Sequence, residues 1–243
     1  MKRILIVGGA VVVLVLVIIA IPAQTFALLL DDYDIHLLDA RGTVWRGSAQ
    51  LVVPGTNLGT LQWNIVPQRL LRANLTYDVS VTGSSVQARG TFAKGFSKTS
   101  LFANAEIQPS IVNSILLHYE MKISGSIQLH DVDLLMNGRN EISSLSGSVE
   151  WEGGKSRYRA GDEVREIDLP AMNGSLIASE GDVILTAMNG QDDTELLNAR
   201  LEAASGWLHI GLSRQMIELA KMRWDAQGSP GSEVFKVSRQ IFR

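Results

Sequence analysis

The hydrophobic and polar positions divide this chain into two unlike parts. Residues 4–21 form one uninterrupted apolar run, ILIVGGAVVVLVLVIIAI, without a charged or hydrogen-bonding side chain. As a helix this run is about 27 Å long, close to the hydrocarbon thickness of a bilayer. From residue 35 onward, short apolar runs alternate with polar positions and are separated by Gly, Ser, Thr and Asn. The pattern therefore predicts a membrane-spanning helix followed by a β-rich domain.

Charges flanking the apolar run give it a direction. Lys2 and Arg3 precede it, three aspartates lie between residues 31 and 34, and the next positive charge is Arg41. Because positive residues are retained on the cytoplasmic side, we expect a cytoplasmic N-terminus. The chain after Ile21 is then expected on the opposite side of the membrane. The predicted segments are a cytoplasmic stub at 1–3, a single transmembrane anchor at 4–22, a juxtamembrane linker at 23–34 and a β-rich domain at 35–243.

A cleaved secretory signal is the alternative interpretation of the apolar run. Thr25-Phe26-Ala27 supplies a small-x-small cleavage site. Signal cores, however, usually hold about 7–15 apolar residues, fewer than are present here, so an uncleaved anchor is favoured. Both interpretations send the rest of the chain to the same side of the membrane. The residues expected to mark the anchor along its length are Ile4, Val11, Leu14, Ile18 and Ile21.

The β-rich part consists of short, evenly spaced runs with a period of two. Thr60–Ile65, Leu75–Val81 and Val86–Phe92 alternate apolar and polar side chains and end at turn residues. Such runs predict an antiparallel sheet, either curved or rolled, in a mainly β fold. Short helices are expected at 67–71 and at 109–119, where Pro occupies a first-turn position, while 213–222 fits a helix or a strand equally well.

A weak internal echo suggests two similar halves. The segment Gly42-Thr43-Val44-Trp45-Arg46-Gly47 resembles Gly147-Ser148-Val149-Glu150-Trp151-Glu152-Gly153. A duplication would give halves at 35–108 and 120–243. Chance similarity between Gly- and Ser-rich strand sequences is the competing explanation.

Composition excludes several classes of function. The chain has no cysteine, so disulfides, thiol catalysis and thiolate metal sites are ruled out. Its net charge is −3, which shows no overall basic bias and makes nucleic acid an unexpected partner.

No catalytic, cofactor-binding or metal-binding residue is predicted. The four histidines, His36, His118, His130 and His209, are far apart in the sequence, and no metal-ligand spacing occurs. There is no nucleophile elbow and no phosphate-binding glycine loop. We therefore expect a protein that is not an enzyme and that requires no cofactor.

Arginine and tryptophan residues form the candidate surface for a partner or an apolar groove. Its members are Arg41, Trp45, Arg46, Trp63 and Trp151. Large core residues covering one face of a sheet are the simpler explanation of the tryptophans. If residues 42–47 are a strand, Thr43 and Trp45 share a buried face, and Val44 and Arg46 share the other. Arg46 then faces an acidic partner or protects an exposed strand edge.

In these residues the chain resembles the type II secretion system protein N family, also called general secretion pathway protein N. The resemblance lies in the stub and anchor, in Gly42–Gly47, in Leu61-Gln62-Trp63-Asn64-Ile65-Val66-Pro67, in the Pro109 helix and in Leu145–Trp151. It implies an inner-membrane protein with a periplasmic domain, an accessory part of the machine that exports folded proteins across the outer membrane. The implied partners are other type II secretion proteins and the inner membrane.

A looser similarity connects the chain to AsmA-like proteins, which build long curved sheets with an apolar inner face. This similarity implies an alternative function, a periplasmic lipid-binding or lipid-transfer module, with lipid as the partner. The two functions differ in what the apolar sheet face does: it is packed in the first and open to a ligand in the second.

Overall fold

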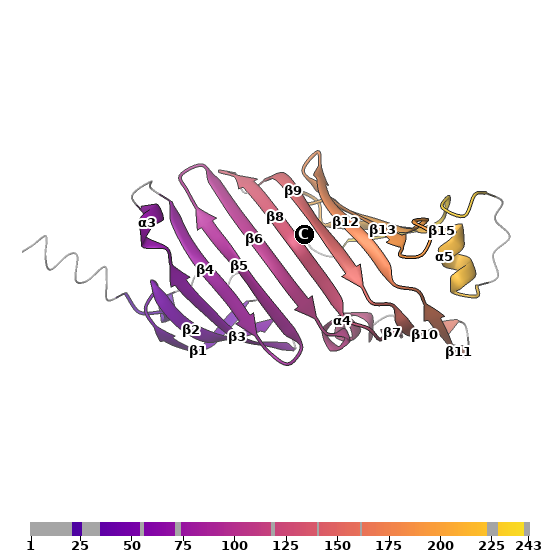
Figure 1. The fold of residues 1–243 in the computed structure, drawn as a ribbon, viewed down its shortest axis with the longest axis horizontal. Helices are drawn as coiled ribbons and strands as arrows, with labels where there is room; N and C mark the ends of the chain where they lie inside the picture. Colours follow the sequence, from indigo (N-terminus) through magenta and orange to yellow (C-terminus); the bar gives the residue numbers. More distant parts are fainter. Residues whose placement is uncertain are drawn as a thin grey trace, which may run out of the picture.

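One large antiparallel sheet dominates the computed structural model (Figure 1). The structure describes residues 21–25, 35–53, 56–70, 74–117, 120–139, 141–160, 162–222 and 228–240. Thirteen strands pair in the order β1-β2-β3-β4-β5-β6-β8-β9-β12-β13-β14-β15-β16, and a smaller sheet has the order β11-β10-β7.

The strands of the large sheet are β1 (His36–Gly42), β2 (Arg46–Val53), β3 (Thr56–Ile65), β4 (Leu75–Thr82), β5 (Val86–Lys94), β6 (Lys98–Ile107), β8 (Ile127–Asn137), β9 (Ile142–Trp151), β12 (Met172–Ser179), β13 (Asp182–Asn189), β14 (Glu195–Leu201), β15 (Trp207–Ser213) and β16 (Glu233–Gln240). The small sheet consists of β7 (Lys122–Ile123), β10 (Gly154–Ala160) and β11 (Glu163–Leu169), and the helices are α3 (Pro67–Leu70), α4 (Pro109–Leu116) and α5 (Arg214–Leu219).

Side-chain alternation gives the large sheet two different faces. In β12, MNGSLIAS, burial alternates residue by residue: Met172, Gly174, Leu176 and Ala178 are half-buried, and the other four residues are exposed. Because neighbouring strands pair in register, the same alternation continues from strand to strand. One face is therefore predominantly apolar and the other predominantly polar.

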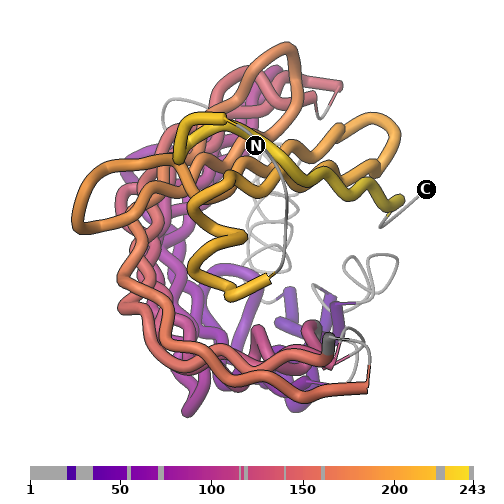
Figure 2. Tube along the Cα trace, turned by 90° about the vertical axis from the view of Figure 1, so that its right-hand side faces the viewer, coloured from indigo at the N-terminus to yellow at the C-terminus, as the bar shows by residue number. Residues whose placement is uncertain are grey.

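The large sheet curls, so that it has an inner and an outer side (Figure 2). Helix α5 lies within this curve and contacts β11, β14, β15 and β16. Its Met216 and Leu219 pack beside Trp151 and Met172 of the apolar face, around a buried cluster that includes Tyr158. We call the apolar face the inner face and the polar face the outer face.

A second buried cluster closes the N-terminal end of the inner face. Trp63 and Tyr77 are 5% and 7% exposed and pack with Leu37, Ala49 and Ala23. The backbone next to Ala23 pairs with the β1–β2 turn, since the N–H of Val44 donates to the carbonyl of Ile21 at 3.0 Å. The chain that emerges from the predicted anchor is thus built into the first strands.

Residues 42–47 do not form one continuous strand, so the condition for the alternating faces considered above is not met. Gly42 pairs with Gly47, and residues 43–45 form the turn of the β1–β2 hairpin, before β2 begins at Arg46. Gly42 has φ +89°, and a Cβ there would lie 2.4 Å from the carbonyl oxygen of Arg46. The backbones of β1 and β2 therefore approach too closely at this point for a side chain. Alternation therefore stops in the turn: Val44 is buried and Trp45 is half-buried, the reverse of the predicted faces.

The predicted mainly β, antiparallel fold is confirmed, together with short helices at 67–70 and 109–116. The ambiguous segment after residue 213 forms helix α5, capped by the Ser213 hydroxyl, which accepts a bond from the N–H of Met216. Strands β6 and β8 pair directly, so the sheet is continuous across helix α4. The division into two similar halves stays a prediction.

No helix within the described ranges is both long and apolar enough to cross a bilayer. The predicted anchor at 4–22, apart from Ile21 and Pro22, and most of the linker at 23–34 lie outside those ranges. Both segments stay predictions.

Candidate functional site

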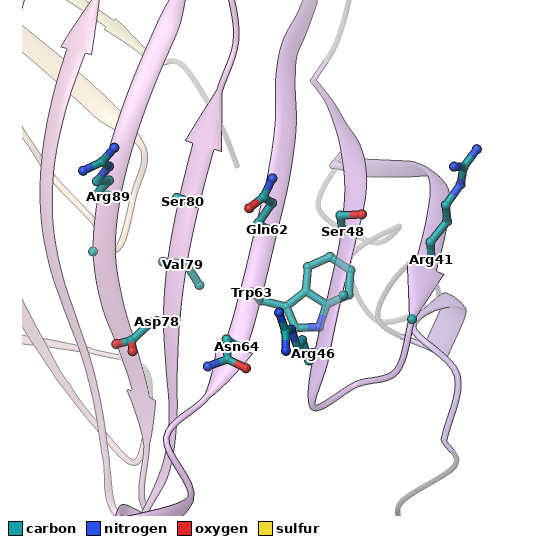
Figure 3. Close-up of a pocket in the computed structure, with 13 residues that line it drawn as sticks. Arg41, Arg46, Ser48, Gln62, Trp63, Asn64, Asp78, Val79, Ser80 and Arg89 are labelled. Carbon is teal, nitrogen blue, oxygen red and sulfur yellow. The ribbon is translucent and has the colours of Figure 1, made fainter.

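An open recess of about 990 Å³ lies over strands β1 to β5 (Figure 3). Strand pairing explains its lining, because residues opposite each other on neighbouring strands point to the same side of the sheet. One row crosses all five strands on the outer face, in the order Arg41, Ser48, Gln62, Ser80 and Arg89. A second row, Arg46, Asn64 and Asp78, runs beside it.

Positive charge dominates this recess. Arg41, Arg46 and Arg89 are exposed, and Asp78 is the one carboxylate among the described lining residues. In the described parts of the chain none of these three guanidinium groups forms an ion pair. Elsewhere arginines do find carboxylates: Arg159 lies 2.7 Å from Glu120, and Arg200 lies 2.6 Å from Asp182. We call the three unpaired residues and their two rows the arginine recess.

A buried tryptophan holds the recess in shape from below. The Trp63 indole covers Gly47, where a Cβ would lie 2.5 Å from the ring, and its Nε1–H donates to the carbonyl of Thr43 at 3.0 Å. The Thr43 hydroxyl in turn accepts bonds from the N–H groups of Trp45 and Arg46, both at 3.3 Å. The turn that carries Arg46 is therefore fixed to the sheet beneath it.

The structure brings together only part of the surface expected from the sequence. Arg41, Arg46 and Trp63 all line the recess. Trp45 lies in the adjoining turn but does not line it. Trp151 is on β9 near helix α5, where its Nε1–H donates to the carbonyl of Ser124 at 2.9 Å, and it belongs to a different cluster. Sequence reasoning missed Arg89, because nothing local shows that β5 lies three strands from β2.

In a comparison with known protein families, residues 34–212 match the model for the type II secretion system (T2SS), protein N. The chain belongs to this family. The match covers the arginine recess and most of the large sheet. Neither curated proteins nor solved structures gave a significant match. Protein N is a secretion accessory family and not a known class of enzyme, and membership supports an accessory role in type II secretion and implies contacts with other secretion components.

The inner face of this protein N family member carries a continuous apolar row. It crosses every strand of the large sheet from β2 to β16: Ala49, Leu61, Val81, Ala88, Ala105, Leu129, Val149, Gly174, Ala187, Leu197, Leu212 and Phe235. The members from Leu61 to Leu212 are all half-buried. With strands about 4.8 Å apart, the row is about 50 Å long.

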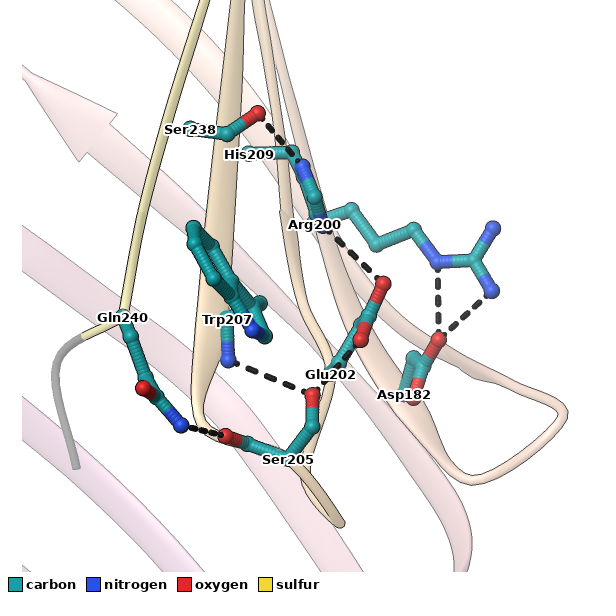
Figure 4. Close-up of polar contacts among 8 residues, drawn as sticks. All are labelled: Asp182, Arg200, Glu202, Ser205, Trp207, His209, Ser238 and Gln240. Carbon is teal, nitrogen blue, oxygen red and sulfur yellow. Dashed lines mark hydrogen bonds and ion pairs between the residues drawn. The ribbon is translucent and has the colours of Figure 1, made fainter. Parts of the chain in front are cut away.

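A polar network at the opposite end of the sheet joins the last three strands (Figure 4). His209 of β15 contacts the Ser238 hydroxyl through Nδ1 at 2.7 Å and Glu202 through Nε2 at 3.0 Å. The Ser205 hydroxyl donates to Glu202 at 2.6 Å, and the Trp207 ring stacks against His209. The sequence suggested an isolated His209, whereas the pairing of β15 with β16 supplies Ser238 and the β14–β15 hairpin supplies Glu202.

The connections in this network resemble those of a serine–histidine–carboxylate relay, but the setting differs. In a hydrolytic triad Nε2 faces the serine and Nδ1 faces the carboxylate, whereas here the two nitrogens have exchanged partners. Ser238 also lies within a strand, not at a turn that presents a nucleophile. Within the described ranges, no three His, Asp or Glu side chains gather as metal ligands. The direct consequence of the network is mechanical, because it ties β16 to β15 and to the end of β14.

Acid is expected to loosen β16. Hydrogen bonds from Ser205 and His209 lower the pKa of Glu202 below its ordinary value of 4.5. A lowered pKa stabilises the folded state above pH 4.5, and this contribution is lost as the pH falls through the lowered value. Hydrogen exchange of β16 amides, corrected for the intrinsic rate, should accelerate below pH 4.5 in the wild type and less in Glu202→Gln. Glu106→Gln, on the outer face of β6, is the control; equal acceleration in all three proteins contradicts the prediction.

Proposed function

We propose that the protein is an inner-membrane accessory component of the type II secretion system that acts through protein contacts in the periplasm. The N-terminus is cytoplasmic, the anchor at 4–22 crosses the membrane once, and the sheet lies on the periplasmic side. The arginine recess is its contact surface. The observation that carries the proposal is the protein N match over most of a sheet whose outer face holds three arginines without an ion pair to any described residue.

Two further features support this proposal. The apolar run and its charge asymmetry have the properties of a single-pass anchor. Residues 21–23 pack against the first strands, so an anchor there holds the recess close to the bilayer. Tethering raises the effective concentration of a weak binding surface near other membrane components.

Removing the gene from a strain with a working type II system is expected to retain exoproteins in the periplasm and reduce them in the supernatant. A photo-crosslinking residue at Gln62, inside the recess, should then capture another secretion component. The same residue at Ser175, on the outer face of β12, is the control and should capture less. Immunoblots of the two fractions and mass spectrometry of the crosslinks give the readout. Unchanged export together with equal crosslinking at both positions contradicts the proposal.

A periplasmic lipid-binding or lipid-transfer module is the second candidate function, and the continuous apolar row favours it. A row about 50 Å long, on the inside of a curved sheet, offers more contact length than one acyl chain needs. Between β5 and β13 its half-buried members belong to neither of the two buried clusters at the ends of the sheet. The occupant that suits such a surface is the hydrocarbon chain of a lipid.

A further inference from the structure

We infer that the arginine recess binds an extended acidic segment of a partner protein, with carboxylates placed at both ends of the segment. This inference deepens the proposed function and rests on it, because it names the chemistry of the contact. Three guanidinium groups that form no ion pair with a described residue line the recess, and the planar guanidinium group presents donors in a geometry that matches carboxylates.

The spacing of the arginines sets the shape of the ligand. Arg41 on β1 and Arg89 on β5 are the ends of one cross-strand row, four strand spacings apart. Four spacings are about 19 Å, and an extended peptide covers that distance with about six residues. Figure 3 shows the row from Arg41 through Ser48, Gln62 and Ser80 to Arg89. A single phosphate group is much smaller than this span and engages one end of it at a time.

Polar side chains between the two ends suit a peptide backbone. Ser48, Gln62 and Ser80 lie between the terminal arginines, and each can both donate and accept hydrogen bonds. Arg46, in the second row, lies on β2 beside Ser48, one strand in from Arg41, and can take a further carboxylate. Asp78 follows Arg46 and Asn64 in that row and disfavours a negative charge beyond it. The arrangement favours an acidic peptide that crosses the strands along the first row.

Fluorescence anisotropy with the full chain in phosphatidylcholine nanodiscs tests the inference. The probe is a labelled peptide of about seven residues in which Glu and Ser alternate, so that an extended chain places all its carboxylates on one side. Replacing its Glu by Gln should abolish binding. Each of Arg41→Ala, Arg46→Ala and Arg89→Ala should raise the dissociation constant about two- to fivefold, as expected for exposed ion pairs. Raising the salt from about 50 mM to about 300 mM should raise the dissociation constant further.

A matched charge change separates the recess from general attraction. The triple substitution of Arg41, Arg46 and Arg89 by Glu should abolish binding, whereas the same substitution of Arg69, Arg139 and Arg157, which lie outside the recess, should leave it within about twofold. Circular dichroism should show that both triple variants keep the β fold. Equal loss in the two variants overturns the inference, as does the absence of binding to the wild-type protein.

A lipid headgroup is the competing source of negative charge. Vesicles of phosphatidylcholine with about 30% phosphatidylglycerol carry it without any peptide. Recess-dependent flotation with these vesicles, without peptide binding, overturns the inference in favour of lipid. Peptide binding can fail while gene removal still blocks export; the proposed function then stands and only the inference falls. If the peptide binds but gene removal leaves export normal, the proposed function falls and the acidic-peptide binding stands.

Discussion

Replacing Trp63 with alanine is expected to lower the free energy of unfolding by about 3–5 kcal/mol, the cost of emptying a large buried aromatic site. Trp63 is 5% exposed, lies at the centre of the N-terminal cluster and donates its indole N–H to Thr43. Its removal leaves a cavity over Gly47 and frees the turn that carries Arg46. Urea denaturation of the full chain in detergent, followed by circular dichroism, measures the loss.

Trp63→Phe separates the two contributions of this residue. It keeps much of the apolar packing but removes the donor to Thr43, and the lost hydrogen bond is expected to cost about 1–2 kcal/mol in addition to the smaller ring's lost contacts. Gln62→Ala, next in sequence but on the outer face, should change stability by less than about 0.5 kcal/mol. A Trp63→Ala protein as stable as Gln62→Ala contradicts the assigned role of the indole.

If the second candidate function holds, placing a carboxylate in the middle of the inner row is expected to reduce the amount of co-purified lipid at least tenfold. Leu129→Glu sets an unpaired charge against the hydrocarbon chain, which costs several kcal/mol, and about 1.4 kcal/mol already corresponds to tenfold. Leu129 is half-buried between Ala105 and Val149, so the folded sheet can keep the new carboxylate in contact with water. Lipid bound to the purified full chain is measured by mass spectrometry after organic extraction.

Gln128→Glu is the matched control for this prediction. It adds the same charge one residue away, on the outer face of the same strand, and should leave bound lipid unchanged. Lipid that persists in Leu129→Glu, or that is absent from the wild type, excludes the lipid-binding function. Export that continues in a lipid-free Leu129→Glu variant would then have to depend on protein contacts.

Local patterns predicted much of the fold and little of the site. Alternation in runs such as Val86–Phe92 reports which side chains share a face, and this needs no knowledge of the neighbouring strand. The conformation of residues 42–47 could not be predicted, because a hairpin turn and a strand can carry the same short Gly-bounded sequence. Only the pairing of Gly42 with Gly47 distinguishes the two. The contact of His209 with Ser238 was missed for another reason, because the two residues are 29 positions apart in the sequence.

By itself, the sequence determined a chain with one long apolar run, a β-rich remainder, an apolar and a polar face along each strand, and the family to which it belongs. These are properties of consecutive residues, so composition and period are enough to reveal them. The tertiary structure alone decided that the strands form one curled sheet, that Arg41 and Arg89 end the same row, and that Trp151 lies apart from Trp63. Strand partners and register depend on contacts between distant segments, and a shift of one residue would exchange the two faces.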